Sequence, residues 1–167
     1  MPVCGDGLVG SQNRSDRSGL GNYELRFSNA GQAIGEARRK NRLHNWPIVV
    51  EGPRDKRALV ALGFTGPVEV LNRGWPIERV VAHLYETYGT RNEAAGGASV
   101  CLMMDWDRTG GRLQRKLAGL MQSFDMMVDE ETRTILQKNL KPETRVVESL
   151  YGMADRLNFH ITQEDRL

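Results

Sequence analysis

The sequence predicts an α/β fold in which a central, mostly parallel four-stranded sheet is flanked by helices. Short apolar runs, such as Pro47–Val50 and Ala98–Met104, alternate with segments whose apolar residues recur at helical spacing. Continuous apolar runs are typical of strands buried on both faces of a parallel sheet. Strands that alternate with helices form parallel βαβ units. Both observations therefore indicate one doubly covered parallel sheet.

The chain of 167 residues is long enough for one domain of ordinary size, and its pattern indicates no second domain. Residues 1–20 are rich in Gly, Ser, Asn and Asp and are predicted to form a disordered tail. Residues 21–46 are predicted to be a helical extension and residues 47–128 the α/β domain. Residues 129–167 are predicted to be C-terminal helices packed on the same domain.

The helical extension contains a helix predicted over residues 29–44, with Ser28 or Asn29 as its N-cap. Basic residues cluster beside the short apolar stripe of this helix: Arg38, Arg39, Lys40 and Arg42. Such a cluster indicates either a solvated helix face or a patch that contacts phosphates.

Proline and glycine mark the elements of the α/β domain. Pro53 begins a helix that ends at Gly63, and a second helix runs from Pro76 to Gly89. The other predicted elements are strands over residues 67–71 and 124–128 and helices over residues 109–124, 129–140 and 143–158.

Composition narrows the class of protein. The chain is 40% hydrophobic and 26% charged, which is normal for a globular protein, and its net charge of +2 permits a polyanionic partner. Its two cysteines are far apart and indicate neither a disulfide framework nor a zinc site. Without a long apolar run or a signal peptide, we expect no membrane span and a cytoplasmic location.

Three acidic residues follow two of the predicted strands: Glu51, Asp105 and Asp107. Ligands bind at the carboxyl ends of strands in open α/β sheets. Because carboxylates brought together repel one another, a bound Mg²⁺ or Mn²⁺ would stabilise all three. We expect Asp105 and Asp107 to hold the metal. Glu51 would be either a further ligand or a general acid or base.

Other residues near these acids are candidates for supporting roles. Asp55 is predicted to orient the site or to interact with a helix N-terminus. The backbone NH groups near Gly52, Gly110 and Gly111 could hold a phosphate, although these residues also suit ordinary turns. Arg108 and Arg112 could bind phosphate oxygens or serve as plain surface charges.

The two motifs together resemble a known signature. Strand–Glu-Gly-x-x-Asp beginning at Glu51, followed by strand–Asp-x-Asp-x-x-Gly beginning at Asp105, resembles the Toprim domain family. That family includes bacterial-type primases, topoisomerases and some nucleases. The resemblance covers roughly residues 47–125. It implies the Toprim (Rossmann-like) fold and the same division of labour among the carboxylates. Its compact form is similar to small stand-alone primase-like proteins and to the maturase nuclease of 5S ribosomal RNA.

These features predict three functions, all with RNA or DNA as the partner. The first is a Mg²⁺-dependent endonuclease for RNA maturation or DNA repair. The second is a primase-like nucleotidyl transferase. The third is a non-catalytic module that binds nucleic acid or takes part in assembly.

Overall fold

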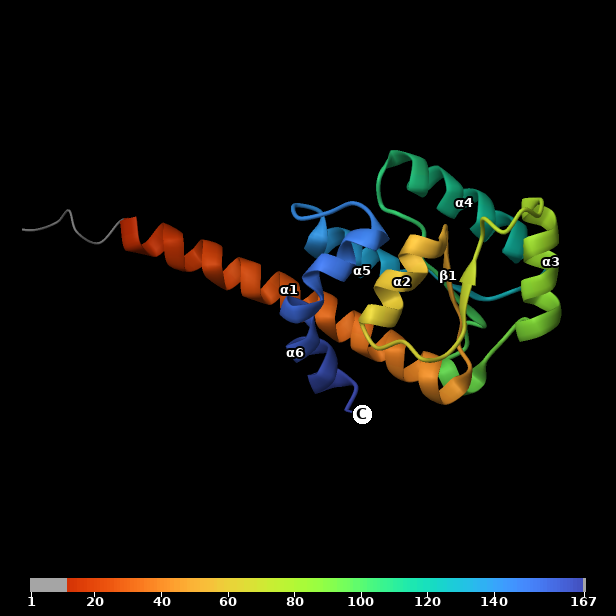
Figure 1. The fold of residues 1–167 in the computed structure, drawn as a ribbon, viewed down its shortest axis with the longest axis horizontal. Coiled ribbons are helices and arrows are strands. Elements are labelled where there is room, and N and C mark those ends of the chain that lie inside the picture. The colour runs from red at the N-terminus through yellow and green to blue at the C-terminus, as the bar shows by residue number, and fades with distance from the viewer. Residues whose placement is uncertain (1–11, 167) are drawn as a thin grey trace, which may run out of the picture.

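The four strands form one parallel sheet, as predicted. The computed structural model describes the backbone of residues 12–166 and the side chains of residues 22–166. The sheet has the order β2-β1-β3-β4, and every pair of neighbouring strands is parallel. Its strands are β1 (Ile48–Val50), β2 (Val68–Val70), β3 (Val100–Leu102) and β4 (Val128–Asp129). The predicted α/β class and parallel four-stranded sheet are therefore confirmed (Figure 1).

Helices cover the sheet on both faces (Figure 1). No helix within residues 12–166 is both long and apolar enough to cross a membrane. The α-helices are α1 (Gln12–His44), α2 (Pro53–Ala61), α3 (Ile77–Tyr88), α4 (Arg108–Ser123), α5 (Glu131–Leu140) and α6 (Ala154–Glu164). Two 3₁₀ helices, η1 (Glu93–Ala95) and η2 (Val147–Met153), complete the described elements.

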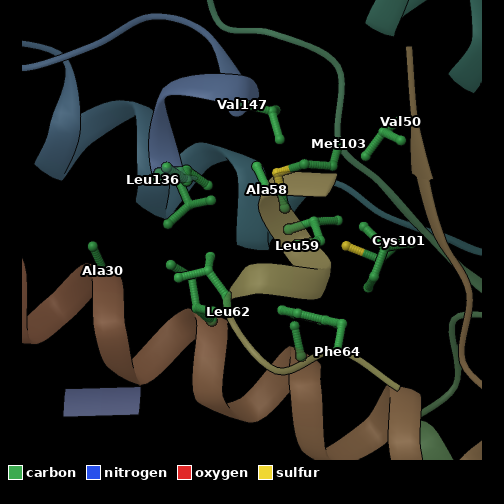
Figure 2. Packing of buried hydrophobic residues seen from close by; sticks show 14 of the residues in the cluster. Ala30, Val50, Ala58, Leu59, Leu62, Phe64, Cys101, Met103, Leu136 and Val147 are labelled. Atoms are coloured by element: carbon green, nitrogen blue, oxygen red, sulfur yellow. The ribbon is translucent and has the colours of Figure 1, made fainter. Parts of the chain in front are cut away.

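The strands separate the interior into two apolar clusters because successive side chains point to opposite faces. Ile48 and Val50 of β1 belong to a cluster with α1, α2, α5, η2 and α6. Val49, between them, belongs to a second cluster with α3 and α4. Figure 2 shows part of the first cluster, including Val147 of η2, Ala58 of α2 and Met103. The acids that follow β1 and β3 therefore lie at the edge of a sheet that is buried on both faces.

Helix α1 is longer than predicted. It begins at Gln12, so residues 12–20 of the predicted disordered tail are helical, whereas residues 1–11 lie outside the described part. Ser28 and Asn29 lie inside the helix and are not its N-cap. Once a helix is nucleated, each added residue forms a hydrogen bond at little further cost, so composition alone misplaced this boundary. The N-terminal half of α1 projects from the rest of the molecule (Figure 1).

The basic cluster of α1 binds the C-terminal segment rather than forming a free face. Arg38 is buried, and its Nε donates to Asp165 Oδ2 at 2.8 Å. Arg42 also pairs with Asp165. Asp165 lies 127 positions from Arg38 and 123 from Arg42, so sequence reasoning could not find these two pairs. Lys40 instead pairs with Glu36 of the same helix, at 3.2 Å. A phosphate-contacting patch here is not supported by these contacts.

The segment predicted as one helix over residues 143–158 is divided. Thr144 and Val146 are joined by a side-chain hydrogen bond in a turn, and η2 and then α6 follow. The buried residues of η2, Val147, Leu150 and Met153, recur every three positions, which is the period of a 3₁₀ helix. This division places η2 beside α2 and the ends of β1 and β3.

Candidate functional site

An open cleft of about 500 Å³ lies at the carboxyl ends of β1 and β3. These strands are neighbours, with Val49 opposite Leu102, so the acidic residues that follow them are brought together. Helix α2 and η2 form the other walls. The charged residues of the lining are Glu51, Arg54, Asp55, Arg57, Asp105 and Glu148.

Asp105 is held in place by residues from the C-terminal part of the chain. Its Oδ1 accepts a hydrogen bond from the backbone N of Val147 at 2.7 Å. Its backbone carbonyl accepts from Nη2 of Arg133 at 2.7 Å. The next residue, Trp106, is buried, and its Nε1 donates to the carbonyl of Thr144 at 2.7 Å. We call this set of contacts, from Arg133, Thr144 and Val147 to residues 105–106, the aspartate clamp.

Three carboxyl groups of the cleft have raised pKa values. Burial raises the pKa of Asp105 to about 6, and the negative charges of Asp55, Glu51 and Asp107 add to this shift, although the Val147 NH bond opposes it. Burial also raises the pKa of Glu51, with Asp55 and Asp107 contributing. The pKa of Asp55 is raised, first by burial and then by Glu148, against the hydrogen bond from Gly52. The cleft therefore concentrates negative charge at a cost in free energy.

Asp107 lies near Asp105 and Glu51, since its charge raises the pKa of both, but it also caps a helix. Strand β3 ends at Leu102, and the chain then turns, so the two-residue alternation no longer applies. Asp107 is the N-cap of α4, and its Oδ1 accepts from the backbone N of Gly110 at 2.7 Å. Within the described residues, no three acidic, His or Cys side chains are grouped closely enough to hold a metal ion. Of the three residues predicted to hold a metal, Glu51 and Asp105 line the cleft, and Asp107 lies nearby with one oxygen used in the capping bond.

The three glycines have structural roles instead of open phosphate-binding NH groups. The NH of Gly52 donates to Asp55 Oδ2 at 2.9 Å, which makes Asp55 part of a capping box for α2. The NH of Gly110 is taken by Asp107, and the NH of Gly111 donates to the Asp107 carbonyl at 2.9 Å. Helix capping therefore already uses the donors that we expected to bind phosphate.

The arginines beside the carboxylates are not the pair that we predicted. Arg108 and Arg112 are exposed on α4, which packs on the opposite face of the sheet from α2, and they do not line the cleft. Arg54 and Arg57, exposed on α2, do line it. Sequence reasoning missed them although both follow Glu51 within one helix. Glu148 was also missed, since no local motif marks it.

We expect the stability of the metal-free protein to fall as the pH rises from 5 to 7.5. The folded state holds the Asp105 proton more tightly than the unfolded chain does. The contribution of this proton to the free energy of unfolding is therefore lost as the pH rises past about 6. Because this carboxyl is partly exposed, the loss should be about 1 kcal/mol. Urea denaturation with a chelator at both pH values measures it.

Asp105→Asn should remove this contribution, and Asp125→Asn, at an aspartate whose side chain is 91% exposed, should not. Equal pH dependence in the wild type and Asp105→Asn would contradict the assignment.

The fold and cleft define an α/β protein with a parallel sheet and a group of carboxylates at its carboxyl edge. Comparison with known proteins names the family. The chain belongs to the UPF0292 family: it is 35% identical over 106 residues to a UPF0292 protein of Thermococcus onnurineus, covering 64% of this chain and 71% of the relative. A UPF0292 protein of Methanosarcina barkeri is 34% identical over 110 residues, covering 66% of this chain and 70% of the relative. A solved structure of a putative protein from Aquifex aeolicus aligns with a TM-score of 0.55 and 26% identity, covering 70% of this chain and 94% of that one.

The Toprim assignment made from the sequence is wrong. No family model matches the chain, and its relatives are UPF0292 proteins. The two motifs that suggested it are short, and the structure gives several of their residues a local role. Asp107 caps α4 and Asp55 caps α2, which is reason enough for acidic residues at both positions.

Proposed function

We propose that this protein is a Mg²⁺-dependent endonuclease that cleaves phosphodiester bonds in nucleic acid. The observation that supports this proposal is the cleft that Glu51, Asp55 and Asp105 line together with two exposed arginines. Carboxylates alone would repel a polyanion. A cleft of this composition can accept a phosphate only when a cation balances the carboxylates.

The oxygen donors of the cleft fit Mg²⁺ or Mn²⁺, and its lining includes neither histidine nor cysteine. Mg²⁺ is usually bound by one or two carboxylates together with waters and substrate phosphates. Glu51 and Asp105 would therefore suffice, without Asp107 as a third ligand. When bound, the ion would polarise a phosphoryl oxygen and stabilise the charge that develops there.

The remaining residues of the cleft have separate tasks. Arg54 and Arg57 would bind non-bridging phosphate oxygens through charge-assisted hydrogen bonds. The Val147 NH bond fixes the Asp105 carboxylate so that its other oxygen faces a ligand.

A cleavage assay with the wild-type protein tests this proposal. Labelled structured RNA, duplex DNA and single strands are incubated with Mg²⁺, with Mn²⁺ or with a chelator. We expect cutting of at least one substrate with either metal and none with the chelator. Thermal unfolding in the same buffers should show stabilisation by the metal, since a ligand that binds only the folded state raises its stability.

Three results would argue against the endonuclease proposal. No cutting, together with nucleic-acid binding that the chelator leaves unchanged, would indicate a non-catalytic binding module. Incorporation of nucleoside triphosphates on a template would indicate a nucleotidyl transferase. An absence of stabilisation by either metal would rule out the proposed role of Glu51 and Asp105.

A further inference from the structure

A second hollow of about 340 Å³ adjoins the carboxylate cleft and shares Arg54, Arg57 and Glu148 with it. Its fourth lining residue is Tyr151 of η2, whose side chain is 65% exposed. We propose that this hollow, the Tyr151 subsite, binds an unpaired base of a single-stranded nucleic acid by stacking on the tyrosine ring. The proposal rests on the proposed function, because it names the form of nucleic acid that enters the same cleft.

The orientation of Tyr151 follows from the period of η2. In a 3₁₀ helix, residues three positions apart lie on the same face. Val147, Leu150 and Met153 are buried, so Glu148 and Tyr151 share a different face, and both line the subsite. The Val147 side chain is in the core (Figure 2). Its backbone N donates a hydrogen bond to Asp105 Oδ1. The tyrosine thus stands on an anchored backbone, and ordering it on binding costs little entropy.

The charged residues of the subsite favour one position for the base and another for the phosphates of the nucleic acid. Arg54 and Arg57 are three positions apart on α2, so they lie on one face of that helix and can bind neighbouring phosphates. Glu148 repels a phosphate at its own position. The uncharged base is therefore expected over Tyr151, and the phosphates are expected on the side of the arginines and the carboxylate cleft.

Single strands suit this arrangement better than duplexes. Proteins bind single-stranded nucleic acid through a basic groove for the backbone and aromatic side chains on which unstacked bases lie. The bases of a duplex are already paired and stacked, so their faces are not free for a tyrosine ring. The subsite has an exposed aromatic ring beside two arginines, next to the carboxylate cleft. This arrangement fits the binding of a single strand.

Fluorescence anisotropy with a short labelled oligothymidine, with Ca²⁺ in place of Mg²⁺ to balance the carboxylates, tests the proposal on binding alone. Tyr151→Ala should weaken binding about 5- to 100-fold, and Tyr151→Phe should stay within about twofold, because stacking needs only the ring. Phe159→Ala is the matched control, since Phe159 is 64% exposed on α6 and outside the subsite. It should leave the affinity unchanged.

An oligonucleotide of the same length with abasic central positions separates stacking from charge. The wild type should bind it as weakly as Tyr151→Ala binds the normal strand, and Tyr151→Ala should not distinguish the two strands. Arg54→Gln should weaken binding to both strands and reduce its salt dependence.

Equal affinity of the wild type and Tyr151→Ala, an equal loss on normal and abasic strands, or no binding of any strand would overturn the proposal. If Tyr151→Ala cuts nucleic acid with the same kcat and KM as the wild type, the Tyr151 subsite is also overturned. The proposed endonuclease function would not be affected by that result. Discrimination against the abasic strand without any cutting would support the subsite and reject the endonuclease.

Discussion

Asp105→Asn is expected to reduce metal-dependent cleavage on the order of 100-fold or more. The substitution removes one of the two carboxylates proposed to hold the metal. The asparagine oxygen can still accept the hydrogen bond that Val147 N donates to Asp105 Oδ1 at 2.7 Å, so the aspartate clamp should persist. Single-turnover cleavage rates with Mg²⁺ measure the loss.

Metal-induced stabilisation gives a second readout of the same variant. The melting temperature of the wild type should rise with Mg²⁺, whereas that of Asp105→Asn should change little. Asp125→Asn serves again as the exposed control and should cleave and bind metal like the wild type. Cleavage by Asp105→Asn within threefold of the wild-type rate would exclude a metal-binding role for this residue.

Gly110→Ala is expected to destabilise the fold by about 3 kcal/mol or more, because the space beside this residue is filled by backbone. A Cβ atom at Gly110 would lie 2.1 Å from the carbonyl oxygen of Asp105 and 2.6 Å from its carbonyl carbon. Backbone atoms cannot rotate away as a flexible side chain can. Either α4 or the loop that carries Asp105 must shift, so metal binding should be lost as well. Chemical denaturation, followed by metal titration of the folded fraction, measures both effects.

The neighbouring glycine provides the control. At Gly111 the nearest atoms to an added Cβ are side-chain nitrogens of Arg115 and Arg133, at 3.7 and 3.9 Å. Gly111→Ala should therefore be tolerated and should stabilise α4 by up to about 1 kcal/mol, through its helix propensity. Similar stabilities for the two variants would contradict the close approach of α4 to Asp105.

The parallel sheet could be predicted because its signals are local. The apolar runs at 48–50 and 100–104 and the helix stop at Gly63 each depend on neighbouring residues alone. The division of residues 143–158 depends on contacts with distant elements, such as those of Thr144 and Val147 with residues 105–106, so local signals placed it wrongly. The ion pair of Arg38 could not be predicted either, because its partner Asp165 lies 127 positions away in the sequence.

The candidate site could be predicted only in part for the same reason. Glu51 and Asp105 were found because each follows an apolar strand. The capping bond of Asp107 to Gly110 was not predicted, because it depends on where α4 begins. Glu148 and Tyr151 come from η2, and only the packing of that helix against α2 brings them to the cleft.

The aspartate clamp also determines when the site can form during protein synthesis. Val147, whose NH fixes the Asp105 carboxylate, is made 42 residues after it. A ribosome-bound chain that ends before residue 147 contains Glu51, Asp55 and Asp105 but lacks the donor that fixes Asp105, and it lacks Tyr151. The cleft is therefore completed late, when the segment that includes η2 has left the exit tunnel.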